Sequence, residues 1–324
     1  MYLAPDEEEQ AVATAAAEFL AEVIPIERLH RPAGMDLSLN QLQSLASMDW
    51  FSMLVPEEAG GSGLSAVEHA LFFREVGRQC GPVEILAQAL AALMLAENDL
   101  SKGISNGQDK VCLAVRDAQV GFRLLGSTDA RYALLGEPQT AALIPLTDHP
   151  STACAPLDPA TSMRVCPTLP EPVATAPGGL FFGLGQLGVA AMLVGCAETA
   201  LALIVEYAKV RETFGKKIGS YQAVRHPCAN MALHVESARA QLWFAATALK
   251  ERHPDAGTHL HTAKHLANEA ALHNADTNIQ LHGGIGVTDE HDAHLLLKHA
   301  LLLERLFGDK RRLLKQLLHA KLEA

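Results

Sequence analysis

The stretch RETFGKKIGSYQAVRH, residues 211–226, separates two long apolar runs in the second half of the chain. Four basic residues lie within fifteen positions of one another there: Arg211, Lys216, Lys217 and Arg225. Phe214 and Gly215 interrupt the helical pattern, so backbone amides and a basic side chain can face an anion together. A solvated corner between two helices explains the same residues, since short motifs often match by chance. The stretch alone leaves both interpretations open.

The sequence on both sides of this stretch has the periodicity of long helices. Before it, six apolar residues form one stripe at helical spacing: Leu193, Cys196, Ala197, Ala200, Leu201 and Ile204. After it, polar residues can cap helices over about 220–250, 255–280 and 288–308 and a terminal helix from 309: Ser220, Asp255, Thr288 and Asp309. Four long helices with short connections predict an antiparallel four-helix bundle.

Composition and charge limit the possible partners and the compartment. Residues 180–197 are apolar enough to suggest a membrane span, but they run on into a charged helix, so we expect a helix buried inside the bundle. The net charge of −11 argues against nucleic acid or an anionic membrane surface as a partner. The six cysteines lie far apart without a CxxC pair, and the acidic amino terminus lacks the layout of a signal peptide. These features predict reduced thiols and a cytoplasmic location.

The first hundred residues have the pattern of a helical unit. Capping boxes and apolar spacing predict four helices: from Asp6 to Pro25, from Asn40 to Met53, from Ser65 to about Arg78 and from Pro82 to Glu97. Three glycines, Gly60, Gly61 and Gly63, could suggest a phosphate-binding loop. No Lys-Ser/Thr pair follows them, so a flexible turn is the better interpretation.

Between about Asp109 and Pro177 the pattern changes to that of a small β unit. Short apolar runs at 111–115, 122–125, 132–135 and 141–146 alternate with Gly, Asp and Ser, which predicts a meander of short strands. Nine of the sixteen prolines fall between Pro138 and Pro177, and we interpret the end of the segment as a proline-rich linker. The segment contains no recognisable nucleotide loop.

Two motifs in the predicted bundle carry a family resemblance. Arg211-x-x-Phe214-Gly215-x-x-Ile218-x-x-x-Gln222 is followed by Gln280-x-x-Gly283-Gly284-x-Gly286. Together they resemble the carboxy-terminal domain of the acyl-CoA dehydrogenase family, and VPEEAGGSGLSAVEHALFFREVGR, residues 55–78, is similar to the amino-terminal domain of that family. The resemblance covers residues 180–324 and 1–100 and is poor over 109–177.

The resemblance implies a mainly α fold with a small β domain. Residues 1–108 would form an amino-terminal helical domain, and residues 109–178 a reduced, sheet-like or barrel-like middle β domain. Residues 179–324 would form the carboxy-terminal antiparallel four-helix bundle.

The resemblance also implies a reaction and a cofactor. Members of this family remove the α-proton of an acyl-CoA thioester with a glutamate, while a hydride passes from the β-carbon to FAD. In the family the two motifs reach across a dimer interface to the flavin cofactor of the neighbouring subunit. The implied FAD-binding residues are Arg211 at the pyrophosphate, Phe214 and Ile218 near the adenine, Gln222 with a hydrogen bond, Gln280 at the adenosine, and Gly283 with Gly284, where backbone approaches closely.

The chain departs from the family where the chemistry takes place. The stretches that hold a subunit's own flavin ring are missing from CLAVRDAQVGFRLLG, residues 112–126, and from ARYALLGEPQTAALI, residues 130–144. The two family positions for the catalytic glutamate fall on Phe307 and Gly185, and Gln186 replaces the arginine that usually follows the second position. Neither Phe nor Gly can accept a proton, so we expect no catalytic base in this chain.

Other residues offer weaker alternatives. Four glutamates could act as a relocated base: Glu198, Glu206, Glu290 and Glu304. Eight histidines invite a metal interpretation: His259, His261, His265, His273, His282, His291, His294 and His299. No Cys or HExxH pattern accompanies them, so we expect no metal. The basic residues at 310–315 fit a solvated face of the terminal helix, with an interface or CoA-phosphate contact as the alternative.

Three hypotheses follow from the sequence. The first is a subunit of a heteromeric acyl-CoA dehydrogenase, in a dimer or an α2β2 heterotetramer, that shares FAD with an acyl-CoA dehydrogenase-like partner. By resemblance, the substrate would be an acyl-CoA thioester of the steroid side-chain type, and an electron-transfer protein would take the electrons. The second is a homo-oligomeric dehydrogenase with a relocated glutamate base. The third is a non-enzymatic scaffold or acyl-CoA-binding protein.

Overall fold

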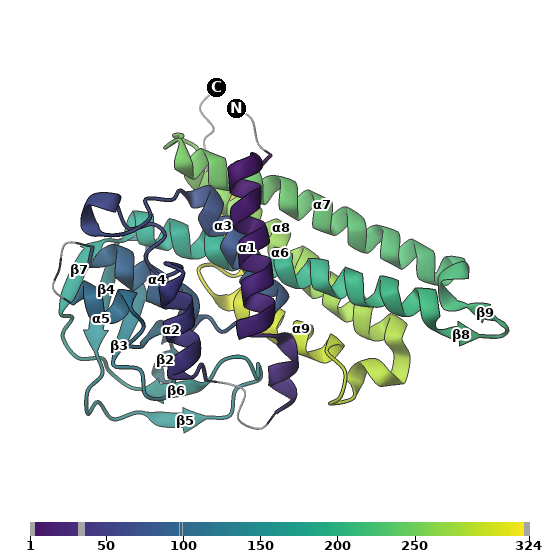
Figure 1. Ribbon diagram of the computed structural model, residues 1–324, viewed down its shortest axis with the longest axis horizontal. Coiled ribbons are helices and arrows are strands. Elements are labelled where there is room, and N and C mark those ends of the chain that lie inside the picture. Colours follow the sequence, from purple (N-terminus) through teal and green to yellow (C-terminus); the bar gives the residue numbers. More distant parts are fainter. Residues whose placement is uncertain (1–3, 32–35, 97, 99, 321–324) are drawn as a thin grey trace.

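A β-sheet and a long helical bundle occupy opposite ends of the molecule (Figure 1). The computed structural model describes residues 4–31, 36–96, 98 and 100–320. Helices from the first hundred residues pack beside the sheet and against the bundle (Figure 1). The predicted class, mainly α with a small β unit and an antiparallel four-helix bundle, is confirmed.

The amino-terminal part is helical, as predicted. Its elements are α1 (Glu7–Val23), η1 (Ile26–His30), α2 (Leu39–Ser47), η2 (Glu57–Ala59), α3 (Ala66–Arg78), α4 (Glu84–Met94) and α5 (Ser101–Ser105). The capping box at Asp6 is present, with its carboxylate accepting from the backbone N–H of Glu9 at 2.9 Å. The box at Ser65 is present too. The predicted end of the fourth helix at Glu97 lies outside the described residues.

The β unit is one seven-stranded mixed sheet. Its strands are β1 (Val111–Asp117), β2 (Gly121–Leu125), β3 (Tyr132–Gly136), β4 (Thr140–Pro145), β5 (Thr152–Cys154), β6 (Met163–Cys166) and β7 (Ala174–Pro177). Their order is β5-β6-β2-β1-β3-β4-β7, and the β1–β3 pair is parallel while the other pairs are antiparallel. The four predicted strands are correct. The sheet is not a simple meander, because β3 joins the far side of β1.

The prediction that the proline-rich segment is a linker is wrong. Three short strands, β5, β6 and β7, lie in it. Most of the prolines lie in the loops that connect these strands, and Pro177 ends β7, an edge strand whose open side needs no N–H. Pro177 closes β7 and directly precedes the first bundle helix.

The carboxy-terminal half forms the bundle. Its helices are α6 (Gly178–Val210), α7 (Gln222–Lys250), α8 (Ala256–His282) and α9 (Ala293–Arg305), followed by α10 (Lys310–His319). Helix α8 packs against α6, α7 and α9. Helix α6 is long and apolar enough to cross a membrane, yet its most apolar stretch is largely buried inside the protein. It is the core helix that the sequence predicts.

Two of the predicted helix caps are wrong and one is confirmed. The hydroxyl of Ser220 donates to the carbonyl of Lys217 at 2.7 Å, and α7 begins at Gln222 without a side-chain cap. The hydroxyl of Thr288 donates to the carbonyl of Ile285 at 3.0 Å, and α9 begins only at Ala293. Asp309 does cap α10, since its carboxylate accepts from the N–H of Arg312 at 2.8 Å.

Candidate functional site

The stretch that separates α6 from α7 folds as a projecting hairpin. Strand β8 (Glu212–Thr213) pairs antiparallel with β9 (Lys216–Lys217), and the turn consists of Phe214 and Gly215. Both turn residues have positive φ, 49° and 75°, as a tight two-residue hairpin turn requires. Neither the anion-site interpretation nor the helix-corner interpretation of the sequence predicts a hairpin. Phe214 is 93% exposed at the tip, so its ring is available to another molecule.

The hairpin displays a guanidinium group without a partner. The backbone of Arg211 is fixed, because its N–H donates to the carbonyl of Tyr207 and its own carbonyl accepts from the N–H of Ile218, both at 2.9 Å. Its side chain is exposed and makes no hydrogen bond or ion pair with any residue that the structure describes. Ile218 is buried at the base of the hairpin, in η3 (Ile218–Ser220), and Gln222 is exposed at the start of α7.

The second motif lies at the same end of the bundle. The rings of Tyr207, near the end of α6, and His282, the last residue of α8, are in contact at an interplanar angle of 33°, with centroids 4.5 Å apart. Gln280 is exposed two residues earlier, and Gly283 and Gly284 open the short helix η4 (Gly283–Val287). A Cβ placed on either glycine would meet no atom within 4 Å, so the backbone there faces open space.

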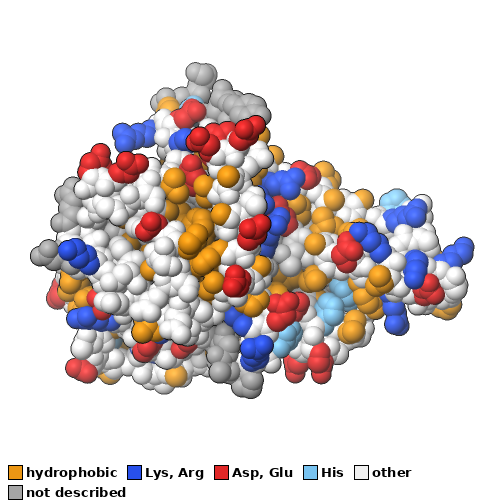
Figure 2. Space-filling model, in the orientation of Figure 1, with side chains coloured by type: hydrophobic (Ala, Val, Ile, Leu, Met, Phe, Trp, Pro, Cys, Tyr) orange, Lys and Arg blue, Asp and Glu red, His pale blue; other side chains and the backbone are white. Residues whose placement is uncertain are grey.

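This end of the bundle presents hydrogen-bonding groups of the kinds that bind a dinucleotide. A free guanidinium suits phosphate oxygens, exposed amide side chains can bond a nucleoside, and open glycine backbone permits close approach. Lys and Arg side chains gather around the hairpin (Figure 2). The phosphate and adenosine portions of FAD fit such a surface. The hairpin and this chain's own β-sheet lie at opposite ends of the long axis of the molecule (Figure 1).

A second place of interest lies where α6, β3 and the turn after α9 meet. Phe307, which follows α9, presses its ring against Gly185 of α6, and a Cβ at Gly185 would lie 2.3 Å from the ring. The ring also meets Phe182 edge-on, with centroids 5.6 Å apart, and lies close to Gly136 of β3. The structure thus brings the two sequence positions considered for a catalytic base into contact, and fills the space between them with an apolar ring.

Buried polar groups hold the turn that carries Phe307. The amide of Gln186 donates to the carbonyl of Phe307 at 2.8 Å, and Gln186 Oε1 accepts from Nδ1 of His261 at 2.9 Å. Nζ of Lys264, which is fully buried, donates to Asn268 Oδ1 at 2.7 Å and to carbonyls at residues 303, 304 and 308 at 3.3 Å. Burial lowers the pKa of Lys264 to about 7.

A cavity of about 360 Å³ remains beside this turn. Its walls are the ends of β1 and β3 on one side and residues 305–312 on the other. The guanidinium of Arg312 lies over the ring of Phe182, with Cζ 5.2 Å from the centroid. Among pockets that bind small molecules, which span roughly 300–1,000 Å³, this cavity is small.

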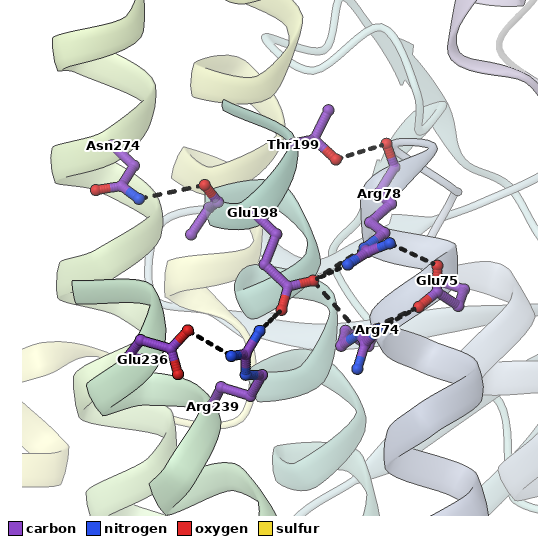
Figure 3. A network of polar contacts seen from close by, with 9 residues as sticks. Arg74, Glu75, Arg78, Glu198, Thr199, Glu236, Arg239 and Asn274 are labelled. Atoms are coloured by element: carbon purple, nitrogen blue, oxygen red, sulfur yellow. Dashed lines mark hydrogen bonds and ion pairs between the residues drawn. The ribbon is translucent and has the colours of Figure 1, made fainter. Parts of the chain in front are cut away.

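The glutamates considered as relocated bases have other roles or lie elsewhere. Glu198 is buried on α6 and is surrounded by guanidinium groups (Figure 3). Its carboxylate accepts from Arg78 of α3 at 2.5 Å, and Arg74 of α3 and Arg239 of α7 each lie 3.4 Å away. This network joins the amino-terminal helices to the bundle. Of the other candidates, Glu206 pairs with Lys209, Glu304 pairs with Arg305, and Glu290 is exposed in the loop before α9.

The histidines make individual contacts with neighbouring groups. His299 of α9 is fully buried, and its Nδ1 lies 2.8 Å from a carboxylate oxygen of Asp158. The rings of His234 and His273 meet edge-on with centroids 4.4 Å apart. Within the described ranges, no three His, Cys, Asp or Glu side chains come together as metal ligands would.

Comparisons with known proteins agree on one family. Residues 180–321 match the model "Acyl-CoA dehydrogenase, C-terminal domain", and residues 6–100 match "Acyl-CoA dehydrogenase, N-terminal domain". Acyl-CoA dehydrogenase IpdE2 of Mycobacterium tuberculosis is 32% identical over 82% of this chain and 81% of its own length. Acyl-CoA dehydrogenase FadE34 of the same organism is 34% identical over 79% of this chain. The matched region makes up 38% of the length of FadE34.

Solved structures share the fold over nearly the whole chain. The ChsE4-ChsE5 complex from Mycobacterium tuberculosis contains a chain with a TM-score of 0.82 at 22% identity, covering 99% of this chain and 100% of that one. The Tcur3481-Tcur3483 steroid ACAD G363A variant gives a TM-score of 0.80 at 24% identity, covering 96% of both chains.

Proposed function

The chain belongs to the acyl-CoA dehydrogenase family, and from this premise we propose that it is a subunit of a heteromeric enzyme that binds its partner's FAD and supplies no catalytic base. The reaction is the α,β-desaturation of an acyl-CoA thioester, an oxidation at a CH–CH bond. The bound FAD supplies the hydride acceptor. This chain positions that cofactor, and the partner provides the remaining flavin contacts and the glutamate.

The position of the hairpin is the observation that carries this proposal. The free guanidinium of Arg211 and the open glycines at 283 and 284 lie at the bundle end, away from the chain's own sheet (Figure 1). A cofactor held there is served by a neighbouring chain. In this role Arg211 binds the pyrophosphate, and the hairpin residues Phe214 and Ile218 pack near the adenine. Gln222, Gln280, Gly283 and Gly284 contact the adenosine side.

The residues at the family's two glutamate positions support the proposal that the partner subunit supplies the catalytic base. The family's two glutamate positions are occupied by Gly185 and Phe307, neither of which can accept a proton. Glu198, the buried glutamate of α6, is committed to three arginines. These pairings disfavour Glu198 as the relocated base of the second hypothesis, and Glu206 and Glu304 are paired with Lys209 and Arg305. The third, a non-enzymatic scaffold, leaves the free Arg211 side chain without a role.

The same comparisons support a proposal for the partners. Two of the solved structures are named as complexes of two differently named chains, and one of these is called a steroid ACAD. We propose by analogy an acyl-CoA dehydrogenase-like partner, in a dimer or an α2β2 heterotetramer. We also propose an acyl-CoA thioester of the steroid side-chain type as substrate, an electron-transfer protein as acceptor, and a cytoplasmic location without nucleic acid or membrane partners.

The test is co-expression with the product of an adjacent acyl-CoA dehydrogenase gene, with flavin counted per chain and turnover measured with an artificial acceptor. We expect fewer flavins than chains in an active complex, and little flavin and no turnover from this chain alone. A yellow preparation of this chain alone that oxidises acyl-CoA would refute the proposal.

Arg211→Ala should weaken FAD binding by the complex. Charge-assisted hydrogen bonds are worth about 1.5–3 kcal/mol, so the dissociation constant should rise roughly 10- to 100-fold. Lys216→Ala is the matched control, because it removes one positive charge from the same exposed hairpin. Equal effects of the two substitutions would reduce the role of Arg211 to general electrostatic attraction, and no effect of Arg211→Ala would favour the scaffold hypothesis.

A further inference from the structure

The ring of Phe307 and the missing side chain of Gly185 are sterically interdependent. A Cβ at Gly185 would lie 2.3, 2.5 and 2.7 Å from three ring carbons of Phe307, distances that atoms in contact do not reach. Since Gly185 lies inside α6, beyond its first two turns, alanine there would otherwise favour the helix. The glycine is therefore explained by the ring that faces it.

The ring has little freedom to move aside. Phe307 is only 8% exposed, and it contacts Phe182 on one side and approaches Gly136 of β3 on another, where a Cβ would lie 3.1 Å from the ring. Its backbone has φ of +52°, unusual for a bulky residue, and its carbonyl is bonded by Gln186. Lys264 fixes the carbonyls on either side of the turn.

We propose that Phe307 and Gly185 form a steric plug that closes this chain's own cleft to an acyl-CoA thioester. The plug occupies the junction of sheet and bundle, and Phe307 lines the cavity of about 360 Å³ beside it. The cleft's identity as a former reaction site rests on the proposed function, whereas the interdependence of the two residues rests on geometry alone.

A double-mutant cycle on the full chain tests the steric part. Gly185→Ala should lower the melting temperature by several degrees, and Phe307→Ala should lower it through lost burial. In a chain that already carries Phe307→Ala, the further change Gly185→Ala should not lower the melting temperature. The double variant should therefore lose fewer degrees than the sum of the two single variants. Gly183→Ala is the matched control, since its Cβ would sit at an ordinary 3.4 Å from Leu260 and should not lower the melting temperature. Additive losses at 185 and 307 would overturn the interdependence.

Titration with hexanoyl-CoA tests the closure itself. Phe307→Ala, or Phe307→Leu if the alanine variant does not fold, should bind hexanoyl-CoA at least about tenfold more tightly than the wild-type chain. A wild-type chain that binds as well as the variant, or a folded variant that gains nothing, would overturn the plug. Both experiments use this chain without its partner. Their outcome is therefore independent of the Arg211→Ala test in the complex, and either proposal can be refuted while the other stands.

Discussion

His69 shows how one buried residue fixes the backbone of α6 next to Gly185. It is fully buried on α3, and its Nε2 donates to the carbonyl of Leu184 at 3.0 Å, one residue before Gly185. Since a carbonyl only accepts, the proton of the neutral ring lies on Nε2. Burial lowers the pKa of His69 to about 4, so the residue is neutral at pH 7.

This pKa predicts an acid-sensitive contribution to stability. Between the unfolded value near 6.5 and the folded value near 4, the unfolded chain binds more protons, so the free energy of unfolding falls as the pH falls. The loss should amount to on the order of 3 kcal/mol by pH 4. Melting curves between pH 4.5 and 7.5 should show a smaller pH dependence for His69→Gln than for the wild type. His226→Gln, at an exposed position, is the control, and identical slopes for all three proteins would contradict the assignment.

The contacts of individual residues were the part that the sequence predicted least. The sequence identified Gly185 and Phe307 separately, as departures from a family pattern. Their contact depends on how α6 packs against the turn after α9, more than a hundred residues later, and no local pattern encodes that packing. The same applies to Glu198, whose three arginine partners come from α3 and α7.

Among the elements, the hairpin β8–β9 combines local order with isolation from the core. Gly215 at its turn has φ of +75°, and a Cβ there would meet no atom within 4 Å. Alanine is therefore strained by its backbone and not by its neighbours, at a cost of about 1 kcal/mol. The strain falls on an element that packs weakly against the rest of the molecule.

Gly215→Ala should therefore separate stability from function. The melting temperature of the chain should change little, because the hairpin can open without unfolding the bundle. FAD affinity of the complex should fall by a few fold, because the turn that presents Phe214 and Arg211 is less populated. Calorimetry and flavin titration check the two halves. A large drop in melting temperature would mean that the hairpin belongs to the cooperative core.

Elements defined by local chemistry were predicted well. The capping boxes at Asp6 and Ser65 depend on contacts three residues apart, and four strands follow from short apolar runs. The short strands β5, β6 and β7 escaped prediction, since strands of three or four residues owe their existence to pairing partners distant in sequence. The wrong caps at Ser220 and Thr288 were hydroxyls that bond carbonyls instead of helix N–H groups. The domain boundaries near residues 108 and 178 stay a prediction.

At the scale of the whole molecule, the ionic network around Glu198 joins the amino-terminal helices to the bundle (Figure 3). Burial raises the pKa of Glu75, the second carboxylate of the network, while Arg78 and Arg74 oppose that shift. Two carboxylates and three guanidinium groups thus meet between α3, α6 and α7. Removing one charge leaves the others incompletely paired.

Glu198→Gln should lower the free energy of unfolding by about 2–4 kcal/mol, less than a fully buried pair would lose because Arg78 is partly exposed. Denaturant unfolding measures this loss. In the complex, turnover per bound flavin should stay unchanged, since Glu198 is not the base. Glu236→Gln, which removes an exposed member of the same network, is the control and should cost much less. Abolished turnover with intact stability would revive the relocated base.

The contact between Gly185 and Phe307 also limits which single substitutions are possible at these two positions. With the Phe307 ring in place, a glutamate side chain at 185 would collide with it. A glutamate at 307 would instead leave the space opposite Gly185 unfilled and would lie beside Phe182 and Gly136. Each single step back towards an autonomous enzyme therefore passes through a less stable protein. Two substitutions would therefore have to be made together to introduce a glutamate here, so packing alone would hold a chain with the proposed function in its dependence on a partner.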